Sequence, residues 1–157
     1  MNVVVAQSGG PTAVINASLL GVYRAARIWD KVDIVYGSLN GIEGILNDRL
    51  VNLNEQLDDC EQQELLRQTP SAALRSCRYK LPNVAEAPQV YEQIRATLEK
   101  HHIGAFFYIG GNDSMDTIKK LSDYAIVTGH TTRFIGCPKT IDNDLALTDH
   151  TPGFGSA

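Results

Sequence analysis

Short apolar runs that stop at glycine or proline alternate with helical stretches along this chain, and this alternation restricts its fold more than any other feature. Residues 2–6, 32–36, 105–109 and 133–137 are predicted strands because they are short, apolar and rich in β-branched or aromatic residues. Helical patterns separate the strands. We therefore expect an α/β fold, with a Rossmann-like, open, mostly parallel sheet and helices on both faces.

Apolar residues at steps of three or four mark the helices. Pro11 suits the first turn of one helix, because its missing N–H has no partner there. Residues 56–68 are predicted to form a polar surface helix, and residues 71–83 a loop or a short irregular strand. The faces expected to be buried are Val14, Ala17, Gly21, Ala25 and Ile28 after Pro11; Val90, Ile94 and Leu98 in residues 86–101; and Met115, Ile118, Leu121 and Ala125 in the helix opened by Asn112.

The composition excludes several classes of protein. The chain has 157 residues, about one domain, and 43% of them are hydrophobic, which argues against disorder. No apolar run approaches the roughly 20 residues of a membrane span. A net charge of −4 argues against nucleic-acid binding. Three scattered cysteines and a start without a basic region predict reduced thiols and a cytoplasmic location.

Ligands of open α/β sheets bind outside the carboxyl ends of the strands, which directs attention to the turns after Gln7, Ile109 and Cys137. Residues 8–10 place two glycines between a strand and a helix, where backbone N–H groups and the helix dipole attract anions. A tight turn explains the same residues equally well.

Residues 110–114, Gly-Gly-Asn-Asp-Ser, repeat this design after a later strand. Asp113 is unusual for a phosphate site because a carboxylate repels phosphate. Asn112 is able to offer an oxygen to hydrated magnesium. Helix capping by these polar side chains is nevertheless the better local interpretation.

Residues 138–144, Pro-Lys-Thr-Ile-Asp-Asn-Asp, carry the sharpest chemical pattern. Two carboxylates stand two residues apart beside a lysine and a threonine, directly after a strand. Such carboxylates bind a cation, or divide into a base and an orienting acid. A turn rich in Asx residues does not require all four groups, so we favour a functional role. Arg75, Arg78 and Lys80 share one loop, for which a solvated basic loop is slightly favoured over a phosphate contact.

Taken together, these segments resemble the phosphofructokinases, and specifically the pyrophosphate-dependent members. The matching stretches are residues 8–16, 36–44, 110–115, 138–145 and 149–157, which span the chain in the family's order. ATP-dependent members usually carry glycine at the positions of Asp113 and Lys139, so these two residues are similar to those of the pyrophosphate users. An ATP-dependent enzyme remains the alternative.

The resemblance implies phosphoryl transfer from pyrophosphate to fructose 6-phosphate, with Mg²⁺, in glycolysis. It makes Asp142 the general base, with Lys139 and Asp113 as further catalytic residues. Gly10, Arg78 and Lys139 would bind pyrophosphate. The residues implied to contact the sugar phosphate are Thr140, Ile141, Asp142 and Asp144, and those implied to hold magnesium are Asn112 and Asp144.

The resemblance also implies a domain organisation. Family members continue into a second α/β domain that completes the sugar site, so we expect residues 1–157 to be a single donor-binding domain without that second domain. A homo-oligomer is expected. A third hypothesis is that these residues alone form a phosphate-binding or assembly module without turnover.

Overall fold

A five-stranded sheet with the order β3-β2-β1-β4-β5 forms the centre of the fold, in a computed structural model that describes residues 1–140, 146, 147 and 149. The strands β1, β2, β4 and β5 are mutually parallel, and β3 is antiparallel to β2 at one edge. Their bounds are Asn2–Gln7 (β1), Val35–Ser38 (β2), Leu50–Asn52 (β3), Ile103–Gly110 (β4) and Arg133–Pro138 (β5).

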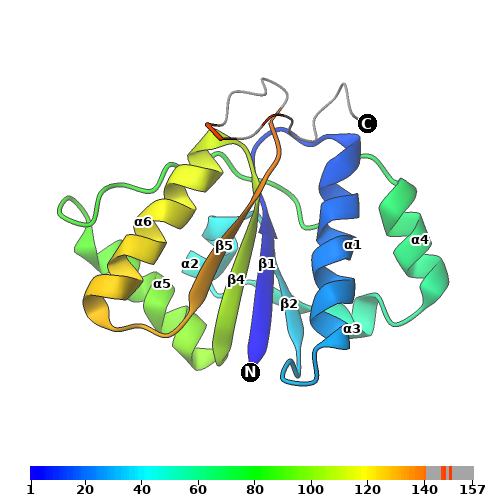
Figure 1. Ribbon diagram of the computed structural model, residues 1–157, viewed down its shortest axis with the longest axis horizontal. Coiled ribbons are helices and arrows are strands. Elements are labelled where there is room, and N and C mark those ends of the chain that lie inside the picture. Colours follow the sequence, from blue (N-terminus) through cyan, green and yellow to red (C-terminus); the bar gives the residue numbers. More distant parts are fainter. Residues whose placement is uncertain (141–145, 148, 150–157) are drawn as a thin grey trace.

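Helices cover both faces of this sheet (Figure 1). One side carries α1 (Ala13–Ile28), α3 (Leu53–Gln56) and α4 (Cys60–Gln68). The other carries α2 (Ile42–Leu46), α5 (Pro88–Lys100) and α6 (Asn112–Thr128). The expected α/β fold with an open, mostly parallel sheet is therefore confirmed. No helix within the described ranges is long and apolar enough to cross a membrane.

The strands are buried on both sides, and their alternation divides the apolar residues into two cores. Val3 and Val5 join the core beneath α1, while Val4 and Ala6 join the core beneath α5 and α6. Each buried valine stabilises the fold by about 1.5–3 kcal/mol relative to exposure. The central strand therefore holds both layers together and gives the loops at its carboxyl end a rigid base.

The predicted face of α1 is wrong. Gly21, Ala25 and Ile28 are exposed, and the helix buries Ile15, Leu19, Leu20, Tyr23 and Ala26 instead. The larger side chains decide the face, because burying them removes more apolar area from water than burying alanine and glycine. The helix also begins at Ala13 after an N-cap at Thr12, so Pro11 precedes the first turn.

Other elements follow the sequence with smaller differences. The apolar faces of α5 and α6 are buried largely as predicted, and residues 71–83 form a loop. The second strand begins at Val35, three residues later than predicted. The short elements α2, β3 and α3 were not predicted, because segments of three to five residues carry too little periodicity to be recognised.

Candidate functional site

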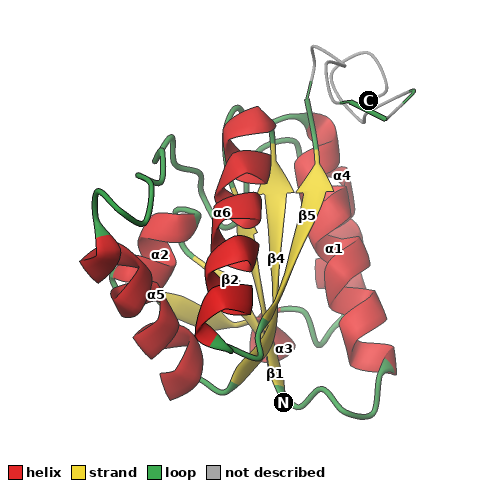
Figure 2. Ribbon diagram, turned by 60° about the vertical axis from the view of Figure 1, so that its left-hand side comes forward, coloured by secondary structure: helices red, strands yellow, loops and turns green. Residues whose placement is uncertain are grey.

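The strand register brings three loops to one edge of the sheet. Gln7 pairs with Ile109, and Gly110 pairs with Pro138, so β1, β4 and β5 end at the same level. Figure 2 shows β4 and β5 ending on the same side as the first turn of α6. The three turns that the sequence indicated as candidate sites are therefore adjacent.

These loops enclose an open cleft of about 660 Å³. Every described residue that sequence reasoning assigned to the site contributes to it. The cleft is lined by Ser8, Gly9, Gly10, Pro11, Thr12, Cys77, Arg78, Tyr79, Gly111, Asn112, Asp113, Ser114, Lys139 and Thr140.

Lys139 joins two of the loops across the cleft. Its side chain is buried, with 6% exposure, and the ammonium donates a hydrogen bond to the Gly10 carbonyl oxygen at 2.7 Å. Its backbone N–H donates to the Gly110 carbonyl oxygen at 2.8 Å. Burial lowers the pKa of Lys139, because removing water disfavours the charged form. The hydrogen bond to Gly10 uses one of the three ammonium protons.

Two buried hydroxyls hold the glycine loops together. Ser114 in the first turn of α6 donates to Ser8 at 2.9 Å. The approach is close at Gly110, where a Cβ would lie 2.1 Å from the Ser114 hydroxyl. Glycine is therefore required there by space. Both serines stood in glycine-rich loops that the sequence singled out, but their mutual contact depends on strand pairing and was not predicted.

Arg78 reaches the cleft because its loop is hydrogen-bonded to the glycines. The Gly9 N–H donates to the Cys77 carbonyl at 3.1 Å, and the Ser76 hydroxyl donates to the Gly9 carbonyl. Deeper in the fold, the Leu74 N–H donates to the buried Gln7 side chain at 2.9 Å. Arg78 is exposed as well as at the cleft, so the solvated basic loop is not contradicted, and a phosphate contact by Arg78 stays a prediction.

Burial of Gln7 was not recognised from the sequence. Its amide also donates to Asn16 at 3.0 Å, and Asn16 accepts from the Ala73 N–H at 2.8 Å. Nearby, Tyr108 lies 3.7 Å from the Cys77 sulfur, and burial raises the pKa of Tyr108 strongly. The hydrogen bonds of Gln7 and Asn16 thus hold residues 73 and 74, in the loop that leads to Arg78, against β1 and α1.

Asn112 and Asp113 are not helix caps. The N-cap of α6 is Gly111, no side chain makes a capping hydrogen bond, and the helix begins at Asn112 itself. The favoured local interpretation of these residues is thus wrong. Both side chains are exposed at the cleft. Asp113 lies in the first turn of α6, so its carboxylate is at the N-terminal end of that helix.

The carboxylate, imidazole and thiol side chains of the described residues are dispersed. No group of three His, Cys, Asp or Glu side chains gathers to hold a metal within residues 1–140 or the three described positions beyond. Oxygens of Asn112 and Asp113 at the cleft suit magnesium, which keeps several waters and needs only one or two protein ligands beside phosphates. Ile141, Asp142 and Asp144 lie outside the described residues.

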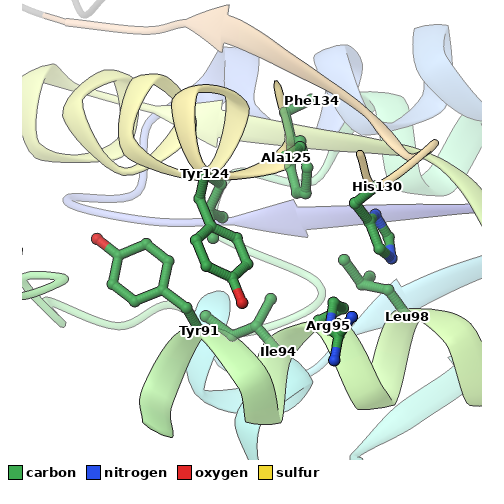
Figure 3. Close-up of a pocket in the computed structure, with 9 residues that line it drawn as sticks. Tyr91, Ile94, Arg95, Leu98, Tyr124, Ala125, His130 and Phe134 are labelled. Carbon is green, nitrogen blue, oxygen red and sulfur yellow. The ribbon is translucent and has the colours of Figure 1, made fainter. Parts of the chain in front are cut away.

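A second, much smaller cavity lies between α5, α6 and β5 (Figure 3). Its volume of about 10 Å³ has room for about one water molecule. Tyr91 and Tyr124 pack beside it with ring centroids 5.1 Å apart. This size excludes a sugar phosphate or a pyrophosphate from the small cavity.

Known proteins are similar to this chain over nearly its whole length. The sequence matches the phosphofructokinase family over residues 2–157. It is 44% identical to a pyrophosphate–fructose 6-phosphate 1-phosphotransferase of Rhodospirillum rubrum, covering 99% of this chain and 37% of that protein. It is 34% identical to an ATP-dependent 6-phosphofructokinase of Vibrio cholerae, covering 96% of this chain and 42% of that protein.

A solved structure shares the fold closely. The pyrophosphate-dependent phosphofructokinase of Nitrosospira multiformis superposes with a TM-score of 0.90 at 44% identity, covering 98% of this chain and 37% of that one. The chain thus spans well under half the length of the relatives it matches.

Proposed function

This chain belongs to the phosphofructokinase family, and from that membership we propose that it supplies the donor half of an enzyme that transfers a phosphoryl group from pyrophosphate to fructose 6-phosphate. The observation that carries the proposal is the meeting of Asp113 and Lys139 in one cleft with Gly10 and Arg78. The products are fructose 1,6-bisphosphate and phosphate. Residues 1–157 form the donor-binding domain of this enzyme.

Pyrophosphate binds where the cleft is most positive. Arg78 and Lys139 supply charge, and the first turn of α1 contains no acidic residue to oppose an anion. Lys139 is held by the Gly10 carbonyl, so its remaining protons are directed before the donor arrives. Phosphoryl transfer depends mainly on such positioning and charge stabilisation.

Asp113 selects the donor. A carboxylate at the start of α6 adds bulk and negative charge where a nucleotide places an inner phosphate. Two unit charges 4 Å apart interact by about 4 kcal/mol at an effective dielectric of 20, which is enough to separate two donors. The closer similarity to pyrophosphate users than to the ATP-dependent relative supports this assignment.

Asp142 removes the proton during transfer. The 1-hydroxyl of the sugar attacks one phosphorus of pyrophosphate, its proton passes to the Asp142 carboxylate, and the bridging P–O bond breaks to release phosphate. Thr140, Ile141 and Asp144 contact the sugar phosphate. Asn112 and Asp144 would hold a hydrated magnesium, which would neutralise phosphate charge. The enzyme is proposed to be a cytoplasmic homo-oligomer that acts in glycolysis.

A coupled assay tests this function on the protein at its natural length, with pyrophosphate and ATP supplied separately. Turnover is expected with pyrophosphate, and Asp142→Asn is expected to lower it by about 10²–10⁴-fold, the usual value of general-base help. Asp30→Asn is the control, because Asp30 is exposed and outside the cleft. Turnover with ATP alone, or near-normal turnover of Asp142→Asn, contradicts the proposal.

A further inference from the structure

The hydroxyl of Thr12 is buried without a hydrogen-bond partner. Within the described residues only one other buried side-chain nitrogen or oxygen shares this state, the Nε of Arg95. Arg95 pairs through its other nitrogens with Glu92 and Glu99, so that side chain is partly satisfied. Thr12 therefore carries the one unpaired buried hydroxyl in the described part of the chain.

This state is unusual for the position that Thr12 holds. Thr12 is the N-cap of α1, with φ −133° and ψ 170°, yet its side chain makes no capping bond. The N-caps of α3 and α4 do make one, because Asn52 accepts from the Asn54 N–H and Asp59 accepts from the Glu61 N–H. An ordinary capping role therefore does not account for Thr12.

The position of Thr12 points to a ligand. It lines the large cleft two residues after Gly10, whose carbonyl holds Lys139. A buried polar group without a partner destabilises the folded protein, and such a group calls for a reason other than folding. The cleft lies beside it, and the first turn of α1 brings no acidic side chain near it.

We propose that Thr12 is a donor-binding residue whose hydroxyl gains its partner only when pyrophosphate occupies the cleft. This inference rests on the proposed function, since it takes pyrophosphate as the donor. Rotation about the Cα–Cβ bond exchanges the hydroxyl and methyl positions between staggered rotamers. The rotated O–H donates to a phosphate oxygen, and a hydrogen bond to a charged acceptor is stronger than one between neutral groups.

The proposal predicts opposite effects on binding and on stability. Thr12→Val keeps the shape and removes the hydroxyl, so the dissociation constant for pyrophosphate is expected to rise about 10- to 100-fold, the range of a lost hydrogen bond to a charged group. The melting temperature of the ligand-free protein is expected to stay the same or rise, because an unpaired buried polar group is gone. Thr12→Ser keeps the hydroxyl and is expected to bind within about threefold of the parent.

Isothermal titration of the protein at its natural length with pyrophosphate, and thermal unfolding without ligand, measure both effects. Thr131→Val is the matched control, because Thr131 is exposed and does not line the cleft. If Thr12→Val fails to fold, Thr12→Ala replaces it. A dissociation constant within twofold of the parent, or a large loss of melting temperature with unchanged affinity, overturns the proposal.

The assay with fructose 6-phosphate separates this inference from the proposed function. If the parent binds pyrophosphate, loses affinity on Thr12→Val, and does not phosphorylate the sugar, the binding role of Thr12 holds and the proposed function fails. If the parent transfers the phosphoryl group and Thr12→Val binds normally, the function holds and the role of Thr12 fails. A parent that does not bind pyrophosphate overturns both.

Discussion

The two glycine loops of the cleft share a sequence pattern but differ in construction. The loop after β1 runs from Gly9, with φ +77°, through Gly10 to an N-cap at Thr12, and the helix that follows has no acid in its first turn. The loop after β4 enters its helix directly after Gly111, and that helix carries Asp113 in its first turn. One loop is open to an anion, and the other opposes additional negative charge.

The space around the glycines also separates the loops. The second loop is tightly packed, because Ser114, which bonds to Ser8 of the first loop, fills the space beside Gly110. Around Gly10 there is room, since a Cβ would meet nothing within 4 Å. We infer that the first loop binds the phosphoryl donor. The second loop limits how large and how negatively charged a bound donor can be.

The largest effect is expected when the carboxylate of the second loop and the ammonium after β5 are both removed. In the double variant Asp113→Gly and Lys139→Gly, the ratio of kcat/KM for pyrophosphate to that for ATP is expected to fall about 100-fold, below the full coulombic limit because Asp113 is exposed. Asp113→Gly accounts for new ATP use, and Lys139→Gly for weaker pyrophosphate use. An unchanged ratio in a folded protein removes both residues from donor selection.

A methyl group is expected to damage the packed loop at one glycine and not at its neighbour. Gly110→Ala places a Cβ against Ser114 and 3.1 Å from the Ser8 carbonyl oxygen, so it is expected to lower the free energy of unfolding by about 2 kcal/mol. Gly111→Ala meets only the Lys139 carbonyl, at 3.6 Å, and is the control. Denaturant unfolding measures both. Equal losses for the two variants would contradict the assignment of tight packing to Gly110.

Backbone strain is expected to distinguish the glycines of the open loop. Gly9→Ala forces a Cβ into a left-handed conformation and is expected to cost about 1–2 kcal/mol of stability. Gly10→Ala has space, so it is expected to change the free energy of unfolding by less than about 0.5 kcal/mol. Denaturant titration compares the two variants. A harmless Gly9→Ala would show that positive φ is not required there.

The smallest effect concerns the bond between the loops. Ser8→Ala and Ser114→Ala, alone and together, form a double-mutant cycle with an expected coupling of about 1 kcal/mol, the usual net value of a hydrogen bond. Ser122→Ala in α6 is the control for serine removal on the same helix. Additive effects of the two substitutions on the free energy of unfolding would mean that the hydroxyls act independently.

Much of the site was visible in the sequence because glycine, lysine and aspartate at strand ends are chemically conspicuous. The structure places Gly10, Asn112, Asp113, Lys139 and Thr140 in one cleft, as their positions after successive strands predicted. The capping interpretation failed although the helix begins at Asn112 as predicted, because the N-cap position falls on Gly111, which has no side chain to make the bond. The donor roles, and those of Ile141, Asp142 and Asp144, remain predictions.

The sequence by itself determined the alternation of strands and helices, the mostly parallel sheet and the edge where the candidate site lies, because these depend on periodicity and on glycine placement within short segments. Only the tertiary structure decided which face of α1 is buried, that Ser8 meets Ser114, that Lys139 reaches the Gly10 carbonyl, and that the Thr12 hydroxyl has no partner. These contacts join segments up to 129 residues apart. They arise from packing between elements, so no local pattern records them.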